Sequence, residues 1–356
     1  MKDKTINGLP PLPVEAWLDN RERLKELLSR YMYGGVFSGG PKDYHVTGEV
    51  LYSELAFWDK HYTQRPIREY VKIKFGGLSF TAEITRPNDA KKHRVITYIA
   101  FQNARNYQIE EEAVIKRGYA IALFTYDQLF PDSCNDAQYK FSENPPLKKL
   151  FDDNTEVKAI AAWAFCASRL LDYLDTTDYA EKNNYIVTGH SRNGKAALCA
   201  GIYDDRFKVV VPNNSGCGGC GCFRFLGGRH GLTQDPKKTE CLQTITSYFP
   251  EWFSKNISQF YDAPDTEYSD GRALNDKLPF DLHFNKALIA PRALLSLEAY
   301  GDEWANTYGS RLTHNAAKEV YKLLGVPDNI KIKFREGAHY FGFKDWVKLL
   351  DFCDAH

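Results

Sequence analysis

A serine at the end of an apolar segment is the residue best placed to do chemistry in this sequence. The segment Tyr185–Thr188 reads as a strand, Gly189 and His190 follow it, and Ser191 stands directly before an alanine-rich helical pattern. A sharp strand-to-helix turn of this kind lifts the serine Oγ above a sheet and points the next backbone N–H at a developing oxyanion. Gly194 falls one position later than in the G-x-S-x-G pattern, so the strand–turn–helix context carries the prediction. An ordinary serine N-cap is the alternative.

Candidate partners for Ser191 stand in the loops after two later strands. The segment Ala293–Leu297 reads as a strand, and Ile330–Phe334 reads as the next one, with His339 in the loop behind it. The loop after the first of these strands carries three carboxylates: Glu298, Asp302 and Glu303. Nucleophile, acid and histidine in this chain order, each at the carboxyl end of a strand, is the arrangement of the α/β-hydrolase triad.

Short apolar runs alternate with helical patterns along most of the chain. The remaining runs are Tyr70–Phe75, Phe80–Thr85, Val95–Phe101, Ala120–Thr125 and Phe207–Val211. The helical patterns lie near Ile109–Lys116, Glu156–Tyr173 and Leu312–Leu324, after Ser191, and from Phe343 onward. Strands alternating with helices predict a mostly parallel central sheet covered on both faces. The first two runs, separated by Gly76-Gly77, predict an antiparallel hairpin that leads into the sheet. We therefore expect an α/β fold, specifically a three-layer α/β-hydrolase sandwich.

The 356 residues are expected to form a single domain, 1–356. Residues 1–65 read as an N-terminal helical extension, because a proline-rich lead is followed by one charged amphipathic pattern over Val14–Tyr31. Residues 213–290 interrupt the alternation with a long glycine-rich and aromatic stretch that has a helical piece near Tyr248–Phe260. Long segments of this kind in compact domains are usually functional, so we expect this one to cover the site.

Composition excludes several partners. Lys and Arg number 46 and Asp and Glu number 46, so the net charge is zero, and no basic run is present. We therefore expect neither nucleic acid nor a membrane surface as a partner, and we expect a monomer. The longest weakly polar stretch, Ala159–Leu171, is too short to span a bilayer. A charged start without an apolar segment favours a cytoplasmic location, although a secreted chain trimmed of its signal would read the same.

Eight cysteines are too few for a disulfide scaffold, and we expect buried free thiols. Two short motifs allow other interpretations: Cys217-x-x-Cys220-x-Cys222 and Gly216-x-Gly218-x-x-Gly221. The first could bind zinc with His230, but no second ligand pair has the usual spacing. The second matches a dinucleotide fingerprint, but no helix pattern follows it. We prefer a tight loop beside the site, and we expect no cofactor and no metal.

Several motifs of the chain resemble the glucuronoyl esterases of carbohydrate esterase family 15. They are Gly189-x-Ser191-Arg192-Asn193-Gly194-Lys195, Asn213-Asn214-Ser215-Gly216 with Gly218-Gly219, Phe249-Pro250-x-Trp252-Phe253, Leu278-Pro279-Phe280-Asp281-x-His283, Ala290-Pro291-Arg292 and Asp302-x-Trp304-Ala305. The resemblance covers about residues 90–350 and is most specific in the serine turn and the Asp-x-Trp loop.

The resemblance implies a role for each matching residue. Ser191 matches the nucleophile, His339 the general base, and Arg192 the arginine whose backbone N–H and guanidinium support the oxyanion. The implied sugar-binding residues are Lys195, Glu240 and Trp304. Trp252 remains undecided between core and site. A second oxyanion donor would come from the loop near Gln102-Asn103, but no glycine pattern there identifies it.

The identity of the catalytic acid is the point at which the sequence departs from many family members. Those members carry a glutamate in a Gln-Glu-Ser-Gly run, whereas this chain has Asn214 at that position. An amide cannot stabilise an imidazolium as a carboxylate does. Other members use the aspartate of the Asp-x-Trp loop, which is Asp302 here. Glu298 ends a strand and should face sideways, and Glu303 is one residue out of register, so we assign the acid to Asp302.

The residues and the resemblance together predict a serine carboxylic-ester hydrolase. Its expected substrates are esters of (4-O-methyl-)glucuronic acid, such as those that join glucuronoxylan to lignin alcohols, cleaved through an acyl-enzyme. An acetyl xylan esterase or a related α/β-hydrolase, such as an oligopeptidase, is the alternative enzyme. A carbohydrate-binding protein that has lost turnover is the alternative of another class, and Asn214 motivates it.

Overall fold

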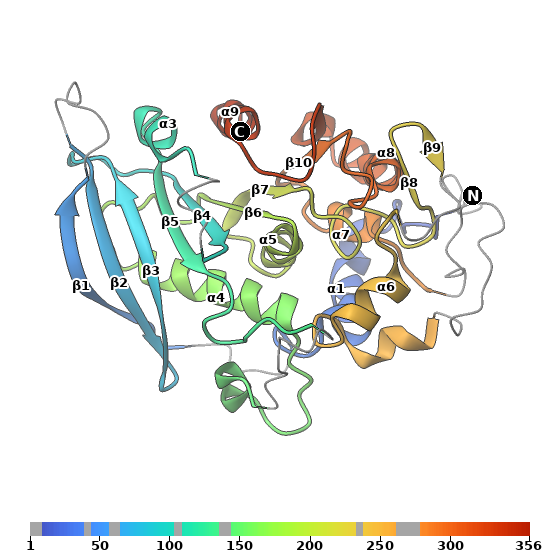
Figure 1. Cartoon of the computed structure of the whole chain (residues 1–356), viewed down its shortest axis with the longest axis horizontal. Helices are drawn as coiled ribbons and strands as arrows, with labels where there is room; N and C mark the ends of the chain where they lie inside the picture. The colour runs from blue at the N-terminus through green and yellow to red at the C-terminus, as the bar shows by residue number, and fades with distance from the viewer. Residues whose placement is uncertain are drawn as a thin grey trace.

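A single large sheet runs through the centre of the molecule (Figure 1). The computed structural model describes residues 9–38, 44–56, 65–102, 109–134, 144–232, 238–260 and 278–356. Within these ranges the sheet has nine strands in the order β1-β2-β3-β5-β4-β6-β7-β10-β11. The strands are β1 (Thr47–Leu55), β2 (Ile67–Phe75), β3 (Leu78–Arg86), β4 (Val95–Ala100), β5 (Ala120–Thr125), β6 (Tyr185–His190), β7 (Phe207–Asn213), β10 (Ala293–Ala299) and β11 (Ile330–Arg335).

The sheet changes from antiparallel to parallel at β5. Strands β1, β2 and β3 pair antiparallel in sequence, and β3 pairs antiparallel with β5. Every later pairing, from β5 through β4, β6, β7 and β10 to β11, is parallel. The β2–β3 turn uses Gly76 and Gly77 with φ values of 52° and 77°, a backbone region that glycine enters without steric cost. The predicted hairpin and the mostly parallel sheet are both confirmed.

Helices cover both faces of the sheet, which makes the three-layer sandwich (Figure 1). The α-helices are α1 (Trp17–Leu28), α3 (Glu111–Lys116), α4 (Ala159–Leu174), α5 (Arg192–Tyr203), α6 (Leu242–Tyr248), α7 (His283–Ala287), α8 (Thr307–Leu323) and α9 (Phe343–Asp354). Short π- or 3₁₀-helical turns are η1 (Ser29–Tyr33), η2 (Pro146–Leu150), η3 (Lys255–Phe260) and η4 (Pro327–Asn329), and β8 (Gly227–Gly228) pairs with β9 (Gly231–Leu232) outside the sheet. In Figure 1, α3 and α9 lie on one side of the sheet and α4 and α5 lie on the other.

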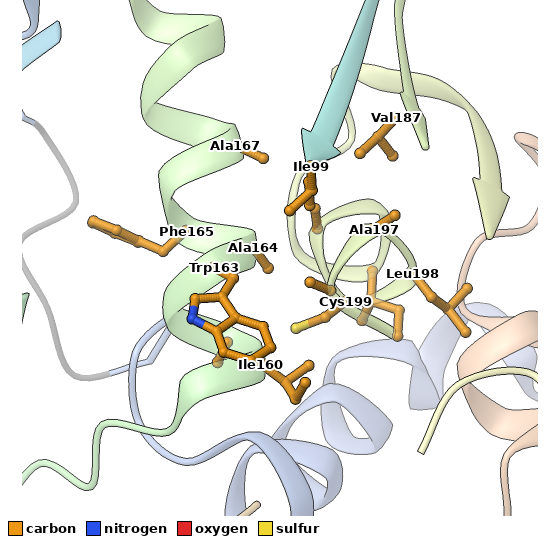
Figure 2. Packing of buried hydrophobic residues seen from close by; sticks show 14 of the residues in the cluster. Ile99, Ile160, Trp163, Ala164, Phe165, Ala167, Val187, Ala197, Leu198 and Cys199 are labelled. Atoms are coloured by element: carbon orange, nitrogen blue, oxygen red, sulfur yellow. The ribbon is translucent and has the colours of Figure 1, made fainter. Parts of the chain in front are cut away.

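The period-two alternation of the strands divides the apolar residues between two cores. Along β6, Tyr185 and Val187 belong to the core that includes α4 and α5, whereas Ile186 belongs to the core that includes Trp346 of α9. Figure 2 shows the first of these cores, with Trp163 of α4 beside α5. Trp163 is fully buried and its indole N–H donates to the carbonyl of Phe130 at 2.9 Å. Packed apolar side chains therefore cover both faces of β6, the strand that leads to Ser191.

The N-terminal region differs from the expected helical extension of residues 1–65. Its helix starts at Trp17, three residues after the predicted start at Val14, and it changes at Ser29 from α1 into the π-helical turn that ends at Tyr33. Residues Thr47–Leu55 then form β1, the edge strand of the main sheet, paired with β2. The side chains of β1 are exposed along almost its whole length, so the strand lacks the apolar–polar alternation by which a half-buried strand is recognised. Backbone pairing with β2, rather than burial, defines this strand.

The long interruption at residues 213–290 contains β8, β9, α6, η3 and α7 in its described parts. The predicted helical piece near Tyr248–Phe260 is two separate elements, since α6 ends at Tyr248 and η3 begins at Lys255. Among the described residues, no helix combines the length and the apolar character needed to cross a bilayer. All eight cysteines lie in the described ranges as free thiols, and every one except Cys134 is buried, as predicted.

Candidate active site

Ser191 occupies a strained turn between β6 and α5. Its backbone has φ 58° and ψ −125°, a combination that is costly for a residue with a side chain. The turn is held from both sides, because the Ser191 N–H donates to the Asn213 carbonyl at 2.9 Å and the Ser191 carbonyl accepts from the Gly194 N–H at 2.9 Å. This geometry is the nucleophile elbow that the sequence predicted, and it raises the serine above the sheet.

Two glycines allow the chain to close this turn, and they explain the unusual spacing of the motif. A Cβ at Gly189 would lie 2.3 Å from the backbone oxygen of Asn193. A Cβ at Gly194 would lie 3.0 Å from the carbonyl oxygens of both Gly189 and Asn213. The close approach of α5 to β6 and β7 therefore falls at Gly194, and the position before it accepts the buried Asn193. The turn keeps its shape although the second glycine comes one residue late.

Asp302 and His339 meet at the carboxyl ends of β10 and β11. The Asp302 Oδ2 lies 2.5 Å from the His339 Nδ1, and Asp302 is only 4% exposed. Burial raises the pKa of the Asp302 carboxyl, but the hydrogen bond and charge of His339 and a hydrogen bond from Asn214 outweigh it and lower the pKa below its usual range. The carboxylate is therefore ionised and orients the imidazole with Nε2 directed away from it.

Asn214, the residue that departs from the family pattern, touches this same carboxylate. Its side-chain Nδ2 donates to the Asp302 Oδ2 at 2.7 Å, and both residues are buried. The Asn214 backbone has φ 43° and its N–H donates to the Leu297 carbonyl at 2.8 Å, which fixes the amide beside β10. The two positions from which family members supply the acid are thus neighbours in space, and here one supplies the carboxylate while the other supplies a donor to it.

The two rival carboxylates of the loop lie elsewhere. Glu298 is 1% exposed and fully enclosed, and burial raises its pKa to about 8 against the attraction of the Lys286 ammonium. Glu303 is exposed, and its side chain lies against Gly228, where an added Cβ would come within 2.9 Å of the Glu303 Cγ. Neither has a described hydrogen bond to His339, whereas Asp302 has one.

His190, the residue before the nucleophile, packs against His339. The two ring centroids are 4.4 Å apart, and the His190 Nδ1 lies 2.6 Å from the Asn213 Oδ1. Burial and repulsion from His339 lower the pKa of His190 to about 3, so its ring is neutral. Because His190 directly precedes Ser191, this contact brings the histidine loop to the elbow. Sequence reasoning overlooked His190, although its place in the serine motif was a signal.

The guanidinium of Arg192 is half-buried and paired beside the elbow. It forms an ion pair with Asp132 and lies over the rings of Phe249 and Trp252, at 5.0 and 4.8 Å from their centroids. Asp132 also accepts from the Trp252 Nε1 at 2.9 Å. This guanidinium, for which the resemblance implies an oxyanion role, therefore already has an ionic partner in Asp132, which the sequence did not reveal.

The three expected sugar-binding residues are brought together on another side of the elbow. Lys195, one turn into α5, donates from Nζ to the Glu240 Oε2 at 3.0 Å and to the Ser215 carbonyl at 2.8 Å. The Glu240 N–H donates to the Trp304 carbonyl at 2.9 Å, and the Trp304 side chain is left exposed. Trp252, undecided from sequence, is buried, and its ring lies 5.6 Å from the Lys195 Nζ.

The cysteine motif and the glycine motif do not form a zinc site or a dinucleotide-binding turn in the described part of the chain. Cys217, Cys220 and Cys222 are buried, whereas His230 is exposed, and the described part of the chain has no group of three or more His, Cys, Asp or Glu side chains that could hold a metal ion. The glycine-rich loop at residues 216–221 closes on itself, with the Gly221 N–H donating to the Gly216 carbonyl at 2.8 Å, and no helix starts there. Of the expected second oxyanion donors, Gln102 donates to Asp127 at 3.3 Å and Asn103 lies outside the described residues.

The strand order, the elbow at the end of β6 and the acid–base pair after β10 and β11 together define an α/β-hydrolase with the residues of a serine ester hydrolase. Comparison with known proteins identifies the family. The family model "Glucuronyl esterase, fungi" matches residues 71–325. The chain belongs to the glucuronoyl esterases of carbohydrate esterase family 15, and it is an esterase.

Individual relatives agree with this assignment. A 4-O-methyl-glucuronoyl methylesterase of Schizophyllum commune is 35% identical, over 91% of this chain and 72% of that protein. The carbohydrate esterase MZ0003, from an unknown prokaryotic organism, is 28% identical over 99% of this chain and 88% of its own length. The solved structure of a promiscuous CE15 esterase from a marine bacterial metagenome superposes with a TM-score of 0.77 at 25% identity, covering 100% of this chain and 95% of that one.

The acid assignment is tested by removing one carboxylate at a time. We expect Asp302→Asn to lower kcat by about 10³ to 10⁴, because the amide leaves His339 in the wrong tautomer. Glu303→Gln is the matched control, since Glu303 is in the same loop but exposed, and its kcat should stay close to that of the wild type. Steady-state hydrolysis of an ester substrate measures both. Equal damage from the two substitutions would contradict the assignment to Asp302.

The neighbouring acid positions allow a rescue experiment. In an Asp302→Asn background, Asn214→Glu places a carboxylate where many family members have theirs, next to position 302, whose side chain contacts His339. We expect part of the lost kcat to return, whereas Asn214→Gln in the same background should restore none. In the wild-type background, Asn214→Glu should lower kcat, because two carboxylates would then compete in one buried space.

Proposed function

We propose that this protein hydrolyses esters of 4-O-methyl-glucuronic acid with Ser191, His339 and Asp302 as its catalytic triad. The observation that carries the proposal is the contact between the buried Asp302 carboxylate and the His339 Nδ1, with the His339 ring 4.4 Å from the ring of His190, the residue before Ser191. That contact leaves the other imidazole nitrogen for the serine. The substrate class comes from the family, whose Schizophyllum commune member is named a 4-O-methyl-glucuronoyl methylesterase.

The reaction runs in two stages. Ser191 Oγ attacks the ester carbonyl carbon while His339 Nε2 takes the hydroxyl proton. The bond from that carbon to the alcohol oxygen breaks, and His339 returns the proton to the departing alcohol, leaving a glucuronoyl ester on Ser191. His339 then removes a proton from water, which attacks the same carbon. The serine oxygen leaves with the proton from His339, and the free acid is released.

Stabilisation of the oxyanion falls mainly to backbone. The Arg192 N–H, at the first position of α5, is aimed by the elbow at the developing charge and lies at the positive end of the helix dipole. The Arg192 guanidinium adds a positive field that the ion pair with Asp132 partly offsets. The contacts with the stacked rings of Phe249 and Trp252 hold the arginine in place before substrate binds, so its conformational freedom is not lost during the reaction, which favours the transition state.

The sugar would bind beside Lys195, Glu240 and Trp304. Lys195 uses two of its three N–H donors in the contacts described above, which leaves one for a sugar hydroxyl. The Glu240 Oε2 accepts from the Lys195 Nζ and from the Cys217 N–H, so Oε1 is the oxygen proposed to accept from the sugar. Trp304 presents an exposed ring on which a sugar face can stack. The ion pair keeps both polar groups in position before substrate arrives, so little ordering is needed on binding.

A wider range of esters is the second candidate function. A cavity of about 500 Å³ lies next to Arg192, lined by Phe101, Tyr126 and Phe249 among other residues, and it has room for more than a methyl group. The related marine esterase is described as promiscuous. Acetyl esters would use the triad without the Lys195 and Trp304 contacts. The ratio of activity on glucuronate esters to activity on acetyl esters separates the two candidates.

The nucleophile is tested with Ser191→Ala. We expect this variant to lose hydrolysis of methyl or benzyl glucuronate while it keeps its melting temperature, because a partly exposed hydroxyl contributes little burial. A fluorophosphonate probe should label the wild type and not the variant. Wild-type turnover retained in Ser191→Ala, or an unlabelled wild type, would reject the serine-esterase proposal.

Sugar recognition is tested with Lys195→Ala, measured on glucuronate and acetyl esters in parallel. We expect KM for the glucuronate ester to rise about tenfold or more, as for the loss of a hydrogen bond to a charged group, with a smaller effect on the acetyl ester. Lys195→Ala also removes the ion-pair partner of the buried Glu240 carboxylate, which lowers the stability of the protein. The double variant Lys195→Ala with Glu240→Gln removes that buried charge as well, so it is the control for this loss of stability. Equal effects on both substrates would mean that Lys195 is structural.

A further inference from the structure

The loop that carries His339 wraps around one buried guanidinium. Arg335 is the last residue of β11, and its side chain is only 3% exposed. The chain then runs through residues 336–342 to the start of α9, with His339 in the middle of this loop. The Arg335 side chain is directed into this loop, and its guanidinium is buried there.

The guanidinium donates to backbone carbonyls on both sides of His339. The Arg335 Nη1 donates to the Ala338 carbonyl at 3.0 Å and to the Glu336 carbonyl at 3.3 Å. The Nη2 donates to the Tyr340 carbonyl. Ala338 and Tyr340 are the residues directly before and after His339, so one planar group holds both ends of the catalytic residue. The loop has no helix or strand pairing between residues 336 and 342 that could do the same.

Asp345 anchors the guanidinium from the other side. The Arg335 Nε lies 2.7 Å from the Asp345 Oδ2, and the Asp345 side chain is 1% exposed. The same carboxylate oxygen accepts from the Gly342 N–H at 3.2 Å, at the first turn of α9. The buried charge of Arg335 is therefore neutralised, and the guanidinium connects the end of β11, the histidine loop and the last helix.

The loop is shaped to fit this group closely. The Tyr340 ring lies over the Arg335 guanidinium, 3.6 Å from ring centroid to guanidinium carbon. Gly337 has φ 105°, and a Cβ there would lie 3.3 Å from the Arg335 Nη1. The loop is also joined to the acid loop, because the Gly301 N–H donates to the Gly337 carbonyl at 3.0 Å. A shift of the guanidinium would therefore move His339 relative to Asp302.

We propose that Arg335, anchored by Asp345, is the positioning residue for His339. The inference rests on the proposed catalytic role of His339. A guanidinium suits this task because its five N–H donors are fixed in one plane, so the ion pair with Asp345 and the three carbonyl contacts form together. An ammonium could keep the ion pair, but it could not span the carbonyls on both sides of His339. The role is separate from substrate binding, which the proposed function assigns to Lys195, Glu240 and Trp304.

The test is Arg335→Lys, which keeps the charge and removes the fork. We expect kcat to fall about 10²-fold with KM changed less than about twofold, because a misplaced base slows the chemistry and leaves the sugar contacts intact. Arg311→Lys is the matched control, since Arg311 is exposed, its guanidinium lies over the Phe334 ring at 5.3 Å, and it has no hydrogen bond to the loop among the described residues. Its kcat should equal that of the wild type.

Two further measurements separate positioning from folding. Added guanidinium chloride, at concentrations too low to unfold the protein, should restore part of the kcat of Arg335→Ala, and methylammonium chloride should not. The rate of fluorophosphonate labelling of Ser191 should fall in parallel with kcat, because labelling requires His339 and no sugar. Should Arg335→Ala fail to fold, Asp345→Asn, which weakens the anchor, is expected to lower kcat about tenfold at unchanged KM.

A wild-type kcat and labelling rate in Arg335→Lys would overturn the inference. A kcat loss fully explained by the unfolded fraction, measured by circular dichroism, would overturn it as well. Failure of the proposed function looks different: the wild type would then lack activity on glucuronate esters, while the labelling rates would still report the position of His339 in each variant.

Discussion

The buried carboxylate of Asp302 is the interaction on which the arrangement of the site depends. An ionised carboxylate removed from water is costly unless donors surround it. Here the donors come from three places: the imidazole of His339, the amide of Asn214 and the N–H of Ala305. Satisfying this one group therefore requires the ends of β7, β10 and β11 to meet, and that meeting forms the acid–base half of the proposed site.

The parallel sheet is what makes such a meeting possible. Parallel neighbours β6, β7, β10 and β11 end at the same edge, so the loops that leave them converge. The residues around the elbow are then paired in advance: Arg192 with Asp132, and Lys195 with Glu240. Both cations lie near the rings of Phe249 and Trp252, which stack with their centroids 3.8 Å apart: Arg192 lies near both rings, and Lys195 lies near the Trp252 ring. The charges therefore need little rearrangement when a substrate binds.

Much of the fold was predictable because local patterns agreed with it. The strands β4, β5, β6, β7, β10 and β11 are short apolar runs, and the strand–glycine–serine–helix order identified the elbow. The prediction was incomplete where pairing rather than burial defines an element. β1 is exposed along almost its whole length and has no alternation to read. The helical stretch near Tyr248–Phe260 divides into α6 and η3, and between them the Ser254 N–H donates to the distant Met32 carbonyl rather than to a preceding helical turn.

The chemistry of the turn follows from local sequence, since Gly189, Ser191 and Gly194 act through backbone geometry within a few residues of one another. The resemblance added the choice of Asp302. The surroundings of these groups, in contrast, depend on contacts between segments that are far apart in the chain. Asn214 reads as a lost acid in the sequence, yet it donates to a carboxylate 88 positions away. Arg335 follows the predicted strand Ile330–Phe334 without any sign of a role, yet its guanidinium donates to the carbonyls of the histidine loop. Contacts between distant segments depend on where the sheet brings its edges together, and no local pattern encodes that.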